Sequence, residues 1–423
     1  MNETHDNTGY DSLGAEESGA ASSILRHYAG LLDERKRNPD LPARTLDNLE
    51  WDRVLKHISD LCMSELGMTA SMHLPLLVRR DAIDLRLRQV SEAQRLAAAE
   101  DRPSAGGLSD VREEVRRAER GGVLDGEQLV AVGKLAESCA RLRRFFAERA
   151  EQFPALHRMA TRLPGVDWLA EMLQYALDPS GMLLDTASPD LGNLRRRVIS
   201  LRTKVRERAE ALTKDTEYED ILQDKFFTLR EGRFVLPVKV GEKGNVPGII
   251  HGRSNSGQTA FVEPTELVEL NNRLSVAELE VEREESRILT RLSGEVAGVA
   301  AELADAVAVV LFFDLTLACG RFAARIDAVV PEVGEAQVEL KSAKHPLLAY
   351  REFETDGEFV CVPNDIRLGA DSANEARILL ISGPNTGGKT VTLKTLGLCA
   401  LMVRAGLPIS AADGSRIPLF ERV

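Results

Sequence analysis

The chain has 423 residues, and its 54 lysines and arginines against 66 acidic residues give a net charge of −12. A composition of 43% hydrophobic, 28% charged and 5% aromatic residues is typical of a globular protein with more than one domain. The longest uninterrupted apolar run, Ala306 to Phe313, has eight residues, whereas a membrane-spanning helix needs about 20. We therefore expect no membrane-spanning segment.

The sequence also lacks the marks of secretion, disulfide bonding and zinc binding. Met1 to Ser22 holds five acidic residues and no lysine or arginine, so it has no basic signal region and a cytoplasmic location is expected. The cysteines form no C-x-x-C pair, and neighbouring ones lie at least 38 residues apart. We interpret all five as reduced packing residues: Cys62, Cys139, Cys319, Cys361 and Cys399.

The first half of the chain divides into a predicted tail and a predicted helical core. Residues 1–44 are rich in Gly, Ser, Asn and Asp, which predicts a disordered acidic tail with at most a short helix around Ile24 to Arg37. From Thr45 onward, apolar residues recur at helical spacing, and turn residues such as Gly121-Gly122 separate the segments. We therefore predict a helical core over residues 45–190.

Residues 191–330 carry two long helical seams with a β-like segment between them. The first seam runs from Leu194 to Leu212, and the second runs from Leu270 to Leu303 in a helix that continues to about Ala328. Between them, alternating patterns predict short strands at 234–240, 248–251 and 259–262. The prediction is an antiparallel helical hairpin that carries a small β-rich module, inserted at about 217–265.

The last segment, residues 331–423, has the order of an α/β domain. Val338 and Leu340 predict a strand, Arg377 to Ser382 a buried strand, and Thr390 to Arg404 a helix that ends before Gly406 and Pro408. The predicted fold class is thus mainly α with an α/β portion.

A G-x-x-x-x-G-K-[ST] motif lies between that predicted strand and helix. In such a loop the backbone amides surround the phosphates of a nucleotide, Lys389 reaches the β and γ phosphates, and the Thr390 hydroxyl ligates Mg²⁺. Hydrolysis also needs an acidic strand end, and the 33 residues after Thr390 contain no apolar strand that ends in Asp-Glu. The motif therefore predicts binding of ATP and Mg²⁺ and leaves turnover open; its residues are Gly383, Pro384, Asn385, Thr386, Gly387, Gly388, Lys389 and Thr390.

From Thr45 to Val423 the chain resembles the MutS family, and more closely its bacterial second-type (MutS-two) branch. The loop Ile381 to Lys394 is similar to the P-loop of that family. Further stretches agree with the branch in the same order: Ser64–Gly67, Arg230–Lys239, Pro247–His251, Ser256-Gly257, Phe261–Pro264, Glu269–Asn272, His345–Leu348 and Val362–Asp365. Gly252 departs from the pattern, because an acidic residue is expected after His251.

The resemblance implies a homodimeric clamp with a helical core, lever helices tipped by a clamp module, and an ABC-type P-loop ATPase head that forms the dimer. Members of this branch are associated with structured or branched DNA, with restraint of homologous recombination, and with stalled ribosomes and their rRNA. The chain ends before the family's glutamine loop, dimer signature, Mg²⁺-binding acidic strand and Smr nuclease module. We therefore expect the first part of the ATPase domain and assign no endonuclease activity.

Within the predicted clamp, residues 225–253 hold six basic residues against Glu231 and Glu242, a local charge that suits a phosphate backbone. The alternative is a solvated β-surface whose lysines prevent edge aggregation. The candidate nucleic-acid-binding residues are Lys225, Arg230, Arg233, Lys239, Lys243 and Arg253.

Three other features receive structural interpretations or remain open. Phe261-Val262-Glu263 imitates the Phe-x-Glu wedge of mismatch-reading relatives, but its place at a strand end favours a structural role. We assign no chemistry to His345. The resemblance implies that Val362 to Asn364 lie beside the adenine of ATP, and the alternative is that these residues only pack against the protein.

Two rival interpretations of the whole chain stay open. In the first, the chain is a dimerising interaction module without catalysis. In the second, it is an SMC-like ATPase with coiled arms, which is disfavoured because the P-loop of SMC proteins precedes the arms, whereas here it follows them.

Overall fold

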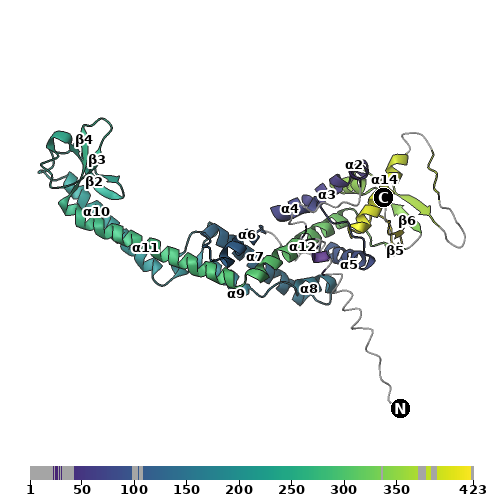
Figure 1. The fold of residues 1–423 in the computed structure, drawn as a ribbon. Helices are drawn as coiled ribbons and strands as arrows, with labels where there is room; N and C mark the ends of the chain where they lie inside the picture. Colours follow the sequence, from purple (N-terminus) through teal and green to yellow (C-terminus); the bar gives the residue numbers. More distant parts are fainter. Residues whose placement is uncertain are drawn as a thin grey trace, which may run out of the picture. The chain divides into compact units, whose positions relative to one another are not determined.

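The computed structural model describes residues 22, 24–26, 28, 30, 42–97, 103, 108–334, 337–369, 378–382 and 388–420. The chain divides into two compact units (Figure 1). Unit 1 comprises Met1–Glu119, Ala131–Glu171 and Val296–Val423, and unit 2 comprises Arg120–Val130 and Met172–Glu295. Helices α7 (Gly126–Glu148), α9 (Asp167–Ala176) and α11 (Thr265–Gly298) each contribute residues to both units.

Unit 1 is built around helix α12 (Ala300–Arg325), which is buried along most of its length. By length and composition alone this helix could cross a membrane, with a mean hydropathy of 1.9, but 89% of its apolar window is buried inside the protein. It is therefore the central core helix of unit 1. The helices of this unit that precede it in the chain are α2 (Ala43–Leu49), α3 (Trp51–Ser59), α4 (Glu65–Ser71), α5 (Arg80–Ala97), α6 (Arg112–Glu119) and α8 (Pro154–Ala160).

The Ser64–Gly67 stretch that resembles the family has a structural explanation in this core. Ser64 caps α4 by accepting a hydrogen bond from the Gly67 amide at 2.9 Å, and its hydroxyl donates to Asp314 Oδ2 on α12 at 2.5 Å. A Cβ added at Gly67 would collide with the Asp314 carboxylate. Glycine at position 67 therefore lets α4 begin directly against α12.

A small mixed sheet completes unit 1, in the order β5-β8-β6-β7. Strand β6 (Val338–Ala343) pairs antiparallel with β7 (Asn364–Leu368) and β8 (Arg416–Pro418), and β5 (Glu332–Gly334) pairs parallel with β8. The remaining helices of the unit are α13 (Pro346–Glu354) and α14 (Lys389–Arg404). The strand predicted at Val338 and Leu340 and the helix predicted at Thr390 to Arg404 are confirmed.

The prediction of a buried strand at Arg377 to Ser382 is wrong for the residues that the structure describes. Residues 378–382 have no regular secondary structure, and Ile378 and Leu380 are 86% and 89% exposed. An apolar run becomes a buried strand only where neighbouring strands and helices cover it. In the described part of the chain, no strand pairs with this run.

Unit 2 contains the predicted helical hairpin. Helices α10 (Leu191–Thr213) and α11 lie side by side in Figure 1, and arginines of α10 pair with glutamates of α11. The α11 partner moves back along the chain as the α10 partner advances, which shows that the helices run antiparallel. The pairs are Arg195–Glu285 at 2.8 Å, Arg197–Glu280 at 2.7 Å, Arg202–Glu278 at 2.6 Å, and Arg208–Glu266.

The second predicted helix is interrupted where a continuous one was expected. Helix α11 ends at Gly298, and Val299 (φ −127°, ψ 27°) separates it from α12. Helical structure nevertheless continues to Arg325, close to the predicted end at about Ala328, with Val299 as the interruption. The apolar residues after the break belong to the core of unit 1, where α12 is buried on most of its surface.

A four-stranded antiparallel sheet in the order β1-β2-β4-β3 joins the two long helices of unit 2. Its strands are β1 (Thr228–Arg230), β2 (Arg233–Lys239), β3 (Gly248–Arg253) and β4 (Thr259–Pro264), so the three predicted strands are confirmed. One sheet face packs on the ends of α10 and α11 through Val205, Leu212, Phe234, Leu236 and Val262. We call this sheet, with residues 214–264, the clamp module.

Two smaller predictions concern the tail and the cysteines. Most of residues 1–44 lie outside the described residues, but Ile24 and Tyr28 are helical and fully buried, so they are not part of an unpacked tail. The Tyr28 ring meets Phe312 edge-on at 5.4 Å, and the Arg86 guanidinium lies 5.1 Å from the Tyr28 ring centroid. Apolar and aromatic contacts therefore order this segment despite its polar composition. All five cysteines are buried and free, as expected.

Candidate nucleotide and nucleic-acid sites

The described part of the phosphate-loop motif is the beginning of helix α14. Gly388 has φ 78° and ψ 7°, a left-handed conformation that favours glycine, and Lys389 and Thr390 form the first turn of the helix. Among the described residues, none has an atom within 4 Å of a Cβ added at Gly388. The other predicted loop residues, Gly383, Pro384, Asn385, Thr386 and Gly387, lie outside the described residues.

Helix α14 is fastened to the start of unit 1 by an ion pair that sequence patterns do not reveal. Lys394 Nζ lies 2.8 Å from Glu50 Oε2, and Glu50 has a left-handed conformation (φ 58°) between α2 and α3. Hydrogen bonds from Lys394 and Arg53 lower the pKa of Glu50 and keep it ionised. Since 344 residues separate the two partners, no local motif could have identified this contact.

His345 and Val362, both near the expected head, have different environments. His345 is 5% exposed, and burial lowers its pKa to about 4, so the imidazole is neutral at pH 7. Its backbone carbonyl accepts hydrogen bonds from Leu348 and Ala349 at the start of α13. Val362, in contrast, is 73% exposed just before β7, and its place beside an adenine stays a prediction.

In the clamp module, the six predicted basic residues separate into two groups. The last residue of β4 is followed directly by α11. Residues that pair with the first residues of β4 therefore lie at the end of the sheet that is remote from α11. Lys239 pairs with Thr259 and Arg253 with Ala260 at that remote end, and Lys243 follows β2 there. We call Lys239, Lys243 and Arg253 the distal basic group.

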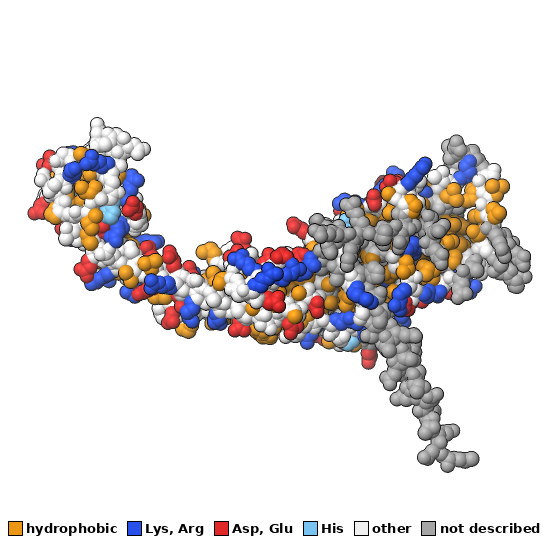
Figure 2. Space-filling view, in the orientation of Figure 1, with side chains coloured by type: hydrophobic (Ala, Val, Ile, Leu, Met, Phe, Trp, Pro, Cys, Tyr) orange, Lys and Arg blue, Asp and Glu red, His pale blue; other side chains and the backbone are white. Residues whose placement is uncertain are grey.

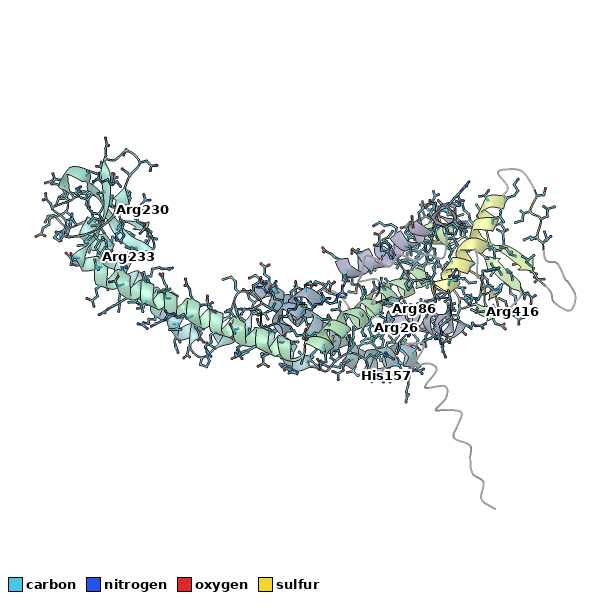
Figure 3. The ribbon with its side chains drawn as sticks, in the orientation of Figure 1. Arg26, Arg86, His157, Arg230, Arg233 and Arg416 are labelled. Carbon is cyan, nitrogen blue, oxygen red and sulfur yellow. The ribbon has the colours of Figure 1, made fainter. Side chains whose placement is uncertain are left out.

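The other three basic residues make contacts within the module. Arg233 donates to the buried Glu263 at 2.8 Å and to Asn272 at 2.7 Å, and Lys225 pairs with Glu219 at 2.5 Å. The Arg230 guanidinium lies 4.1 Å from the centroid of the Phe261 ring (Figure 3). Arg233 is therefore committed to the fold, so sequence counting overstates the charge available to a polyanion.

The Phe261-Val262-Glu263 stretch has structural contacts. Glu263 is completely buried and accepts hydrogen bonds from Asn271 at 2.8 Å and from Arg233, while His251 Nε2 lies 2.7 Å from its other oxygen. Burial acts to raise the pKa of Glu263, but hydrogen bonds from Asn271, His251 and Arg233 together lower it. These partners hold β4 against α11 and β3.

Gly252, which departs from the family pattern, also has a structural reason. It has φ 123°, and the β3–β4 register shifts between Ile250 and Arg253 at this point. A β-bulge with a left-handed residue favours glycine over an acidic side chain.

Surface charge differs along unit 2. Acidic and basic side chains alternate over the lever helices in Figure 2, as expected from the ion pairs between α10 and α11. In the distal basic group, Lys239 donates to the Asp220 carbonyl at 2.8 Å, a neutral acceptor. Among the described residues, no carboxylate forms an ion pair with any member of this group.

Several known proteins share extended sequence similarity with this chain. No family model matches the chain. The chain is 38% identical over 381 residues to a protein of Pelotomaculum thermopropionicum named Endonuclease MutS2. The aligned region covers 90% of this chain and 47% of that protein. Proteins of the same name from Anaeromyxobacter sp. and Symbiobacterium thermophilum are 37% and 38% identical, again over 90% of this chain and 47% and 46% of their own lengths.

The chain thus spans about half the length of the curated relatives it matches. Identity at this level extends over nine-tenths of the chain. The chain belongs to the MutS2 family.

Proposed function

We propose that this chain is an ATP-binding clamp that engages structured nucleic acid. In this proposal the loop Gly383–Thr390 binds ATP, with Lys389 at the β and γ phosphates and Thr390 at Mg²⁺. The proposal is supported by the position of Gly388, Lys389 and Thr390 at the start of α14, with Gly388 in a left-handed conformation, in a chain that is 38% identical to a MutS2 protein. The helix N-terminus adds favourable interaction with negative charge.

The nucleic acid contacts the distal basic group in this proposal. Lys239, Lys243 and Arg253 lie at one end of the sheet and lack carboxylate partners among the described residues. Groups of this kind bind phosphates by charge and read shape rather than base sequence. Branched DNA and ribosomal RNA are the two substrates to compare, and a cytoplasmic homodimer formed through the ATPase head is part of the same proposal.

The nucleotide part is tested with a fluorescent ATP analogue and the full chain. Lys389→Ala should reduce Mg²⁺-dependent binding at least tenfold, because it removes the charge that offsets the phosphates. Lys134→Ala, an exposed lysine on α7, is the matched control and should bind like the parent. Equal affinity of the parent and Lys389→Ala proteins would contradict the proposal.

The nucleic-acid part is tested with a labelled four-way DNA junction and an rRNA fragment of equal length. Reversing the charge of Lys243 and Arg253 should weaken binding and flatten its dependence on salt, whereas Lys134→Glu should change neither. If the salt dependence stays the same in the distal variant, this group does not contact the phosphates.

The alternative is an interaction module that dimerises without turnover. Its support is the exposed apolar run Ile378–Leu380, which a protein partner could cover. Sedimentation reports dimerisation, and ATP hydrolysis above the Lys389→Ala background would exclude the inert version.

A further inference from the structure

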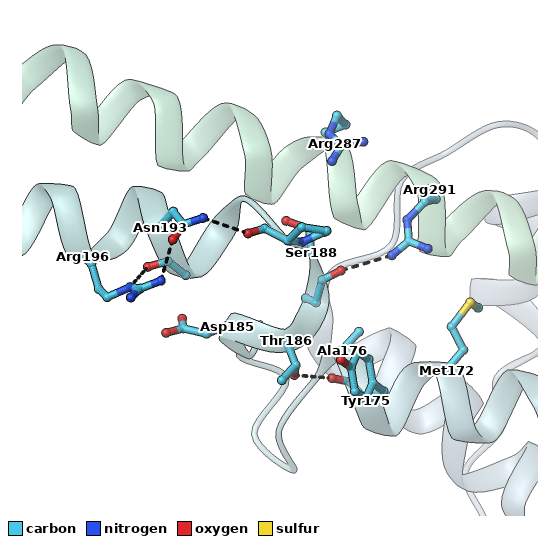
Figure 4. A pocket seen from close by; sticks show the side chains of 13 residues that line it. Met172, Tyr175, Ala176, Asp185, Thr186, Ser188, Asn193, Arg196, Arg287 and Arg291 are labelled. Carbon is cyan, nitrogen blue, oxygen red and sulfur yellow. Dashed lines mark hydrogen bonds between the residues drawn. The ribbon is translucent and has the colours of Figure 1, made fainter.

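Unit 2 contains a pocket that lies outside the clamp module. Its volume is about 800 Å³, and it is lined by the end of α9, the 3-10 turn Asp185–Ala187 and the segment that follows it, the first turns of α10, and the middle of α11 (Figure 4). Neither the phosphate loop nor the distal basic group contributes to its walls. The proposed function therefore leaves this pocket without a role.

Three arginines from the two lever helices line this pocket. Arg196 comes from α10, and Arg287 and Arg291 come from α11 (Figure 4). Arg287 is held by Glu284 through two hydrogen bonds of 2.7 Å. Arg196 donates to the Gly192 carbonyl and to Asn193 Oδ1, and Arg291 donates to the Ala187 carbonyl, so both contact only neutral oxygens in the described structure.

Two acidic residues near the pocket, Asp185 and Glu284, are already engaged. Asp185 pairs with Arg195 at 2.8 Å, and Glu284 accepts from both Arg287 and Ser188. The hydrogen bonds from Arg287 and Ser188 lower the pKa of Glu284 to about 2, so it stays ionised and keeps Arg287 in place. Arg291 also lowers the pKa of Glu284, by a smaller electrostatic effect, but neither Arg196 nor Arg291 forms an ion pair with a carboxylate among the described residues, so both can contact an anion.

The wall of the pocket is also preorganised. The Ser188 hydroxyl donates to Glu284 at 2.6 Å and accepts from the Leu191 amide at 3.1 Å, which ties the loop before α10 to α11. The Thr186 hydroxyl donates to the Tyr175 carbonyl at 2.7 Å and ties the same loop to α9. A ligand would therefore meet fixed backbone rather than a loop that it must order.

An aromatic ring completes the pocket. Tyr175 is 64% exposed and lines the wall together with Met172 and Pro189. Exposed tyrosine beside unneutralised arginine is the combination on which single nucleotides bind, because the ring stacks with a base while the guanidinium binds phosphate. A bare phosphate ion would make no use of the ring.

We propose that this pocket binds a nucleotide unit, with its base on Tyr175 and its phosphate between Arg196 and Arg291. The unit comes from an unpaired stretch of a nucleic-acid strand or from a free nucleotide. Both sources share the same chemistry, and the experiment separates them.

The test measures binding of fluorescein-labelled oligothymidylate to the full chain that carries Lys243→Glu and Arg253→Glu, which removes distal binding. In this background Tyr175→Ala should weaken binding about tenfold, since stacking is worth about 1–3 kcal/mol per base. Tyr175→Phe keeps the ring and should retain affinity. The double variant Arg196→Ala and Arg291→Ala should lower the salt slope by about 0.7, the value for one phosphate contact on a single strand.

Competition with unlabelled thymidine monophosphate identifies the source. Displacement that depends on Tyr175 assigns the pocket to free nucleotides, whereas Tyr175-dependent binding of the strand alone assigns it to unpaired nucleic acid. Either result supports the proposal. Equal binding by the Tyr175→Ala and parent proteins, or equal competition by inorganic phosphate and thymidine monophosphate, would overturn it.

The two proposals can fail separately. If the distal substitutions alone remove all strand binding and monophosphate does not bind, the pocket proposal fails while the distal basic group keeps its role. Thermal unfolding of each variant shows that loss of binding does not arise from loss of fold.

Discussion

Two carboxylates, Asp314 in unit 1 and Glu263 in unit 2, are equally buried and yet have opposite electrostatic environments. Asp314 accepts hydrogen bonds from the backbone amides of Met63 and Ser64 and from the Ser64 hydroxyl, and burial raises its pKa. Glu263, in contrast, contacts basic side chains, and its pKa is lowered. Burial alone therefore does not set the charge of a group; its partners decide.

The difference follows from what each carboxylate joins. Asp314 joins the start of α4 to the core helix of unit 1, and neutral donors suffice for that purpose. Glu263 lies in the sheet that carries candidate phosphate-binding residues, and it takes Arg233 away from the surface. The following predictions test how far this contrast extends.

The largest effect is expected from Glu263→Ala. The change leaves Arg233 without its buried partner and removes an acceptor from Asn271, which costs about 3–5 kcal/mol for a broken buried pair. Hydrogen exchange should show the loss in the clamp module. Glu231→Ala, at a side chain that is 82% exposed, is the control and should have little effect; similar protection in both variants would mean that the cluster does not stabilise the module.

Gly67→Ala should destabilise unit 1 by about 1–3 kcal/mol, because the added Cβ would overlap the Asp314 carboxylate. The matched control is Gly294→Ala within α11, where nothing lies within 4 Å of the added Cβ. The control should stabilise its helix by about 0.5–1 kcal/mol. Chemical denaturation measures both changes, and the same sign for the two would contradict the packing argument.

The pH dependence of stability should have opposite signs in the two units. The lowered pKa of Glu263 means that its contribution is present above its ordinary value of 4.5 and is lost as pH falls through the folded-state pKa. The raised pKa of Asp314 means that stability is lost as pH rises from its ordinary value of 3.8 through the folded-state pKa. Asp314→Asn should remove the second dependence, and Glu263→Gln the first, in hydrogen exchange resolved by unit.

The smallest effect on stability is expected from Lys394→Ala. The Lys394–Glu50 pair is partly exposed, with side chains 28% and 33% accessible, so it contributes about 1 kcal/mol or less. Glu50→Gln should give a similar small change in denaturation, because it breaks the same pair. A loss several times larger would show that this pair supports the whole start of unit 1.

Sequence patterns correctly predicted the elements that are defined by residues close together in the chain. The strands around Phe234, Ile249 and Phe261 and the helix after Thr390 were all confirmed, since each has a clear period and glycine-marked ends. The run at Ile378 to Leu380 was predicted wrongly because burial of such a strand depends on distant strands. The helix break at Val299 follows Gly298, but a single glycine inside a helical pattern is tolerated and did not by itself predict a break.

The candidate sites were predictable to different degrees. A local motif was enough to propose Lys389 and Thr390, whereas Arg233 was named as a phosphate contact although it pairs with Glu263. The pocket beside Tyr175 combines residues more than 100 positions apart, and Glu50 meets Lys394 across an even longer separation. Contacts at such distances depend on tertiary packing and leave no periodic trace in the chain.

In the described ion pairs between α10 and α11, each arginine comes from α10 and each glutamate comes from α11. Two copies of α10 from separate molecules would bring like charges together, and so would two copies of α11. The hairpin thus discriminates against self-association of its arms and favours intramolecular closure.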